Sequence, residues 1–140
     1  MKIALLGYGK MGKVIERIAL ERGHEIVLRK SSSDSYDGLE NADVAIDFSV
    51  PTSAVRNIST CFDTNIPVVS GTTGWLEQYD AVVQECREKD GAFLYGSNFS
   101  LGVNLFFELN NYLAKMMANL KEYNVTMEEI HHTQKLDAPS

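Results

Sequence analysis

The 140-residue chain has 44% hydrophobic residues and a formal net charge of −6. The apolar content is typical of a folded domain and excludes a disordered segment, and the acidic balance argues against a broad nucleic-acid-binding surface, which needs excess Lys and Arg. No apolar run approaches the roughly 18 residues of a membrane span and the start is too short for a signal peptide, so we expect a cytoplasmic protein whose cysteines stay reduced.

Strand and helix signals alternate along the first hundred residues. Short apolar runs predict strands over residues 3–6, 26–28, 44–48, 66–70 and 93–95. Apolar residues at helical spacing predict helices over residues 12–22, 51–61 and 76–89. This βαβα order predicts an α/β fold with a doubly wound parallel sheet of the Rossmann type.

The pattern changes after residue 98, where we expect a domain boundary. Apolar spacing predicts a longer helix over about 103–120, and the alternation over 124–130 predicts a strand. The expected organisation is therefore a dinucleotide-binding domain over residues 1–98, followed by the beginning of a second domain over 99–140.

A glycine-rich turn lies directly after the first predicted strand. Gly7, Gly9 and Gly12 have the G-x-G-x-x-G spacing, with Lys10 and Met11 between them. In dinucleotide-binding folds the first glycine makes the tight turn, the second lets a pyrophosphate approach the backbone, and the third packs helix on strand. The alternative is a glycine-rich turn that binds nothing.

Arg29 and Lys30 stand where the second strand ends, 22 and 23 residues after Gly7. An acidic residue near this position is expected for NAD, whereas cations would accept the 2′-phosphate of NADP. We therefore expect NADPH to be used at least as well as NADH. The alternative is that both side chains are solvated charges at a strand end.

Three further strand ends carry small, polar or aromatic residues that we expect to meet the cofactor in one crevice. They are Phe48 and Ser49, then Gly71, Thr72 and Thr73, then Ser97, Asn98 and Phe99. In an open α/β sheet, ligands bind outside the carboxyl ends of the strands. The small residues would admit a flat ring, the threonines and the asparagine would bind a carboxamide or ribose, and the first phenylalanine would pack on the cofactor. The threonine segment has an alternative reading as an ordinary strand-to-helix turn.

The last ten residues concentrate proton donors and cations, namely His131, His132 and Lys135. A histidine titrates near neutrality, and a lysine supplies a fixed charge for a carboxylate. Each residue alone is also compatible with an ordinary surface position. Adjacent histidines on a strand point to opposite faces and cannot easily chelate one ion, so we expect no metal site.

Together these segments resemble the dihydrodipicolinate reductase (4-hydroxy-tetrahydrodipicolinate reductase) family of the diaminopimelate–lysine pathway. The matching segments, in the family's order, are residues 7–12, 47–49, 71–74, 98–104 and 129–140. The last two segments are the specific ones, because many dehydrogenases share the glycine turn.

The resemblance implies that NADPH or NADH delivers a hydride to a cyclic imine dicarboxylate, yielding tetrahydrodipicolinate. It assigns His131 as the general acid, Lys135 as the catalytic lysine, and His132 and Ser140 to substrate binding. It also implies an α+β substrate domain and a homotetramer. The acidic balance and the lack of a long apolar run argue against a nucleic-acid or a membrane partner.

One departure from the family pattern affects activity. In the family a Gly-Thr pair follows the position of Ser140, and most of the substrate domain lies further downstream. We therefore expect this polypeptide to bind dinucleotide with little turnover. The competing interpretations are another two-domain NAD(P)-dependent dehydrogenase and a non-catalytic NAD(P) sensor.

Overall fold

A computed structural model of the chain describes residues 1–31, 34–128 and 130. Its contacts divide the chain into two compact units, Met1–Phe99 and Ser100–Ser140. No helix among the described residues has the length and apolar character needed to cross a membrane.

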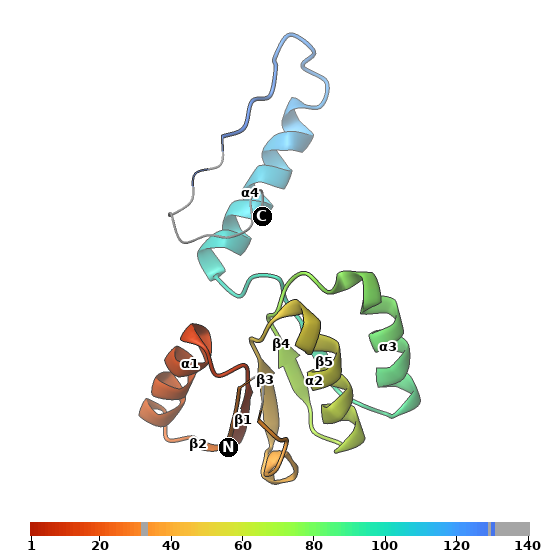
Figure 1. Cartoon of the computed structure of the whole chain (residues 1–140). Helices are drawn as coiled ribbons and strands as arrows, with labels where there is room; N and C mark the ends of the chain where they lie inside the picture. The colour runs from red at the N-terminus through yellow and green to blue at the C-terminus, as the bar shows by residue number, and fades with distance from the viewer. Residues whose placement is uncertain (32–33, 129, 131–140) are drawn as a thin grey trace. The chain divides into compact units, whose positions relative to one another are not determined.

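The first unit is built on a five-stranded parallel sheet with the strand order β2-β1-β3-β4-β5 (Figure 1). The strands are β1 (Lys2–Leu6), β2 (Glu25–Lys30), β3 (Val44–Asp47), β4 (Val68–Ser70) and β5 (Phe93–Tyr95). The chain starts at β1 in the interior of the sheet, extends it on one side with β2 and then on the other side with β3. This reversal confirms the expected doubly wound fold. In such folds ligands bind at the carboxyl ends of the strands where the order reverses, here β1 and β3.

Helices cover both faces of the sheet. They are α1 (Lys10–Glu21), α2 (Pro51–Asp63) and α3 (Tyr79–Glu88), with short 3-10 turns at η1 (Leu39–Asn41) and η2 (Leu76–Gln78). Figure 1 shows α1 on one face and both α2 and α3 on the other. The helix expected over 76–89 is thus a 3-10 turn followed by α3.

Strand β1 shows why both faces are covered. Ile3 and Leu5 pack in the apolar cluster that includes Ala19 of α1, whereas Ala4 and Leu6 pack in the larger cluster that includes Ile58 of α2. Successive strand residues point to opposite faces, so an uninterrupted apolar run requires a packed layer on each side.

The second unit contains α4 (Leu101–Met117), whose start is capped by Ser100, which accepts a hydrogen bond from the Val103 N–H at 3.4 Å. The strand expected over 124–130 is not formed: residues 124–128 and 130 have no regular secondary structure. A strand needs a neighbour for its backbone N–H and C=O groups. Among the described residues of this unit no other strand is present to provide one.

Candidate functional site

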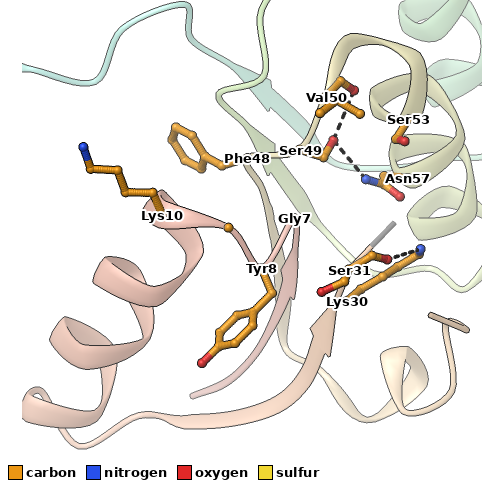
Figure 2. Close-up of a pocket in the computed structure, with 11 residues that line it drawn as sticks. Gly7, Tyr8, Lys10, Lys30, Ser31, Phe48, Ser49, Val50, Ser53 and Asn57 are labelled. Atoms are coloured by element: carbon orange, nitrogen blue, oxygen red, sulfur yellow. Dashed lines mark hydrogen bonds between the residues drawn. The ribbon is translucent and has the colours of Figure 1, made fainter. Parts of the chain in front are cut away.

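A cavity of about 400 Å³ opens at the carboxyl ends of β1, β2 and β3, where the sheet topology predicts a ligand site (Figure 2). Its walls are the glycine turn after β1, the end of β2, and the segment joining β3 to α2. The lining residues are Gly7, Tyr8, Gly9, Lys10, Lys30, Ser31, Phe48, Ser49, Val50, Ser53 and Asn57.

The three glycines of the turn have different surroundings. Gly7 has a φ of +98°, and a Cβ there would lie 2.2 Å from the carbonyl oxygen of Phe48. A Cβ on Gly12 would lie 2.5 Å from the Gly7 carbonyl oxygen. A Cβ on Gly9 would meet no protein atom within 4 Å. The fold itself therefore requires glycine at the first and third positions, whereas the second leaves open space beside the backbone.

Backbone N–H groups of the turn are divided between the sheet and the start of α1. The Gly7 and Tyr8 N–H groups donate to the Lys30 carbonyl, at 2.9 and 3.0 Å. Helical hydrogen bonding begins at Lys13, whose N–H donates to the Gly9 carbonyl at 3.1 Å. The N–H groups before Lys13 have no intrahelical acceptor, and with the positive end of the helix dipole they favour an anion.

The two cations at the end of β2 lie on opposite faces of the sheet. Lys30 is 7% exposed and lines the cavity, with its ammonium 3.1 Å from the Ser31 carbonyl oxygen and 4.6 Å from the centre of the Tyr36 ring. Arg29 is not a lining residue and instead pairs with Glu16 of α1, with 2.6 Å between Nε and Oε1. Of the two cations at the end of β2, Lys30 alone lines the cavity.

Glu16 also accepts a hydrogen bond from the Tyr8 hydroxyl, so both of its oxygens have donors. These hydrogen bonds, the one from Tyr8 first, hold the pKa of Glu16 below its usual value. The same contacts raise the pKa values of Tyr8 and Arg29. Tyr8 thus joins the wall of the cavity to the ion pair on the other side of the turn.

Behind the cavity, the buried carboxylate of Asp47 organises three elements. It accepts hydrogen bonds from Asn57 Nδ2 at 2.8 Å, Ser70 Oγ at 2.8 Å and Thr72 Oγ1 at 2.7 Å. Thr72 Oγ1 in turn accepts from the Ser49 N–H at 2.8 Å. A fully buried carboxylate requires such partners, and here they fix the ends of β3 and β4 and the first half of α2.

Asn57 connects this network to Lys30. Its Oδ1 accepts a hydrogen bond from the Tyr36 hydroxyl at 2.7 Å, and the Tyr36 ring lies beside the Lys30 ammonium. Figure 2 shows Lys30 and Asn57 on one side of the glycine turn and Lys10 extending on the other. A hydrogen-bonded chain therefore runs from Tyr36 through Asn57 and Asp47 to the end of β4, and a cation–π contact adds Lys30 at the end of β2.

Sequence reasoning missed several of these residues. Tyr8, Ser31, Val50, Ser53 and Asn57 line the cavity, and Asp47 and Tyr36 support it, but none was expected as a site residue. One available signal was Asp47 itself, because an acidic residue in an otherwise apolar strand is rarely buried unless polar groups pair with it.

Of the three further strand ends expected at the cofactor, the end of β3 is the one that lines this cavity. Phe48 and Ser49 line the cavity, but the cavity does not extend to Gly71, Thr72, Thr73, Ser97, Asn98 or Phe99. A Cβ on Gly71 would lie 2.3 Å from the Phe48 ring, and one on Gly96 would lie 2.9 Å from the Phe99 ring. The centres of these two rings are 6.1 Å apart. The space that the small residues leave is thus occupied by the chain's own aromatic rings.

The expected catalytic and substrate residues His131, His132, Lys135 and Ser140 lie outside the described residues. Their roles stay predictions. Among residues 1–31, 34–128 and 130, no group of three His, Cys, Asp or Glu side chains is arranged to hold a metal ion.

Comparison with known families gives two adjoining matches. Residues 1–99 match the family described as "Dihydrodipicolinate reductase, N-terminus", and residues 102–140 match "Dihydrodipicolinate reductase, C-terminus". The resemblance inferred from the motifs is thereby confirmed.

Curated relatives agree. The chain is 57% identical over its whole length to the 4-hydroxy-tetrahydrodipicolinate reductase of Christiangramia forsetii, covering 59% of that protein. It is 34% identical to the protein of the same name from Staphylococcus carnosus, again over its whole length, covering 60% of it. The chain therefore spans about three fifths of the length of these relatives.

Solved structures show the fold alone. A putative homoserine dehydrogenase from Archaeoglobus fulgidus superposes with a TM-score of 0.53 at 15% identity, covering 68% of this chain and 42% of that one. A homoserine dehydrogenase from Thermoplasma acidophilum gives a TM-score of 0.51 at 15% identity with the same coverage.

Proposed function

The chain belongs to the dihydrodipicolinate reductase family, and we propose that it holds the nicotinamide dinucleotide that reduces 4-hydroxy-tetrahydrodipicolinate to tetrahydrodipicolinate in lysine and diaminopimelate biosynthesis. Its relatives are named for this reductase. NADPH or NADH supplies the hydride when bound, and the residues of the chain supply binding, orientation and protons.

The open space at Gly9 is the observation that carries the proposal. The fold requires no glycine at this position, since a Cβ would meet nothing there, yet the position lies on the cavity wall at the start of α1. A missing side chain beside helix N–H groups is what a pyrophosphate needs for close approach. The residues present therefore fit a dinucleotide.

Lys30 supports the use of NADPH. It is a nearly buried cation on the cavity wall at the end of β2, the place where the adenosine ribose is bound in this class of fold. A 2′-phosphate there would gain a charge-assisted hydrogen bond. We therefore expect NADPH to bind at least as tightly as NADH, with Lys30 as the main residue that favours NADPH.

The chemical roles are assigned through the family resemblance. We assign His131 as the acid that protonates the reduced product, because hydride addition leaves negative charge in the conjugated system. Lys135 is the catalytic lysine, and His132 and Ser140 bind the substrate, whose carboxylates require fixed cations and hydrogen-bond donors. We also propose that a reductase of the relatives' full length is a cytoplasmic homotetramer.

Calorimetric titration of the chain with NADPH and NADH tests the proposal, followed by a turnover assay on the cyclic imine. We expect saturable binding of one dinucleotide per chain and little turnover by the 140-residue polypeptide. Absence of binding by either dinucleotide would overturn the proposal. Turnover at rates typical of reductases would overturn the expectation of little turnover. If the chain binds dinucleotide but a version extended to the length of its relatives has no reductase activity, a non-catalytic NAD(P) sensor is favoured.

A further inference from the structure

Building on this function, we propose that Glu16 tunes the choice between NADPH and NADH by holding Arg29 away from the cavity. Glu16 lies on α1 and does not line the cavity, and its one contact with a lining residue is the hydrogen bond that it accepts from the Tyr8 hydroxyl. It is therefore a positioning residue, and it acts through the arginine that the sequence places beside Lys30.

The contacts of Glu16 fix its carboxylate firmly. Its side chain is 16% exposed, one oxygen accepts from Arg29 Nε at 2.6 Å, and the other accepts from the Tyr8 hydroxyl. Tyr8 belongs to the glycine turn, whose backbone is anchored to β2 through the Lys30 carbonyl. The carboxylate thus has a defined position, and Arg29 follows it.

The guanidinium of Arg29 is turned toward the beginning of its own strand. Its NH1 lies 3.4 Å from the carbonyl oxygen of Ile26, three residues earlier in β2. Ligands bind beyond the other end of the strand, where Lys30 and Ser31 line the cavity. The Nε and NH2 nitrogens contact Glu16, and NH1 points toward the start of β2, away from the end where a phosphate would bind.

The consequence is electrostatic. Arg29 is paired with a carboxylate of opposite charge, so the end of β2 presents only one unpaired cation, Lys30, to the cavity. A released arginine would offer a planar fork that binds phosphate through two hydrogen bonds. The Arg29 side chain is 42% exposed and has the freedom to move once the carboxylate is gone. The pair with Glu16 therefore weakens selection for a 2′-phosphate.

The test compares dissociation constants for NADP⁺ and NAD⁺ in the wild type, Glu16→Gln and the control Glu21→Gln. Glu21 lies on the same helix and pairs with Arg17 at an exposed site. We expect Glu16→Gln to bind NADP⁺ about fivefold more tightly, the effect of one freed charge, with NAD⁺ unchanged and the control like wild type. An unchanged ratio of the two constants would overturn the proposal.

The same substitution in an Arg29→Ala background separates release of the arginine from mere loss of a negative charge. We expect the gain for NADP⁺ to disappear in the double variant. An equal gain in both backgrounds would overturn the proposal.

A measurement on the wild type guards against misfolding of the variants. We expect the Arg29 Nε–H NMR signal to shift equally with saturating NADP⁺ and NAD⁺, because the side chain stays on Glu16. A large shift with NADP⁺ alone would overturn the proposal. If neither dinucleotide binds to the wild type, the proposed function fails instead.

Discussion

Asp47 accepts a hydrogen bond from the Thr72 hydroxyl at 2.7 Å, which joins the end of β3 to the loop that follows β4. The same carboxylate binds Asn57 of α2 and Ser70 of β4. This one buried anion ties together the elements that form the back of the cavity, so the shape of the site depends on a residue that does not line it.

Replacing Asp47 with Asn should destabilise the fold. The amide nitrogen cannot accept a hydrogen bond, so in either orientation at least one of the three buried donors loses its acceptor, at a cost of about 1–3 kcal/mol. Urea unfolding of Asp47→Asn measures this loss in the free energy of unfolding. The exposed Asp80→Asn is the control and should change it little. Equal stability of both variants would show that the network contributes nothing.

Lys30→Met tests the cation on the cavity wall. Methionine keeps most of the length and apolar character of the buried lysine stem, so the fold should persist. We expect NADPH to bind about tenfold more weakly, the effect of one lost hydrogen bond to a charged group, and NADH to bind as before. Lys13→Met, at an exposed position of α1, is the control for loss of positive charge. Equal weakening of both dinucleotides would contradict a role for Lys30 at the 2′-phosphate.

The pH dependence of stability tests the Glu16 contacts. Hydrogen bonds from Tyr8 and Arg29 depress the pKa of Glu16 from its usual 4.5. A depressed folded-state pKa stabilises the protein above the unfolded value, and this contribution is lost as pH falls through the folded value. From about pH 5 to about pH 3, the unfolding free energy of the wild type should therefore fall more steeply than that of Glu16→Gln. Parallel slopes would mean that the carboxylate gains nothing on folding.

The two cysteines should react at different rates. Burial, with a smaller contribution from Asp47, raises the pKa of the Cys61 thiol to about 12. Cys61 is fully buried and Cys86 partly exposed. Since the thiolate is the reactive form, an aromatic disulfide reagent at neutral pH should modify one thiol quickly in the folded chain and both in denaturant. Cys86→Ser should abolish the fast reaction, and a fast reaction that survives this change would contradict the burial of Cys61.

The sheet could be predicted because its signals are local. Apolar runs such as 3–6 and 93–95 are too short for helices and are followed by glycines or turns. The roles of Gly7 and Gly12 followed from their spacing for the same reason. Arg29 and Lys30 were both expected at the 2′-phosphate, although adjacent strand residues begin on opposite faces of a sheet.

What could not be predicted depends on tertiary partners. The links from Asp47 to Asn57 and Thr72 join residues 10 and 25 positions apart. The filling of the space at Gly71 by Phe48 depends on the distance between two strand ends. The strand expected over 124–130 failed because alternation supplies a pattern but not the neighbouring strand that hydrogen bonding requires.

The central claim is that a dinucleotide binds with its pyrophosphate against the glycine turn. Titration of Gly9→Ala with NADPH and NADH, with Gly102→Ala as the control, tests it most directly. Apart from the adjoining residues and the local helix backbone, neither added methyl has a protein atom closer than 3.9 Å, so both variants should unfold at nearly the wild-type temperature. If a pyrophosphate lies against the turn, Gly9→Ala should bind NADPH and NADH at least about tenfold more weakly, and Gly102→Ala should bind them like wild type. Unchanged binding by Gly9→Ala would contradict a dinucleotide in this cavity.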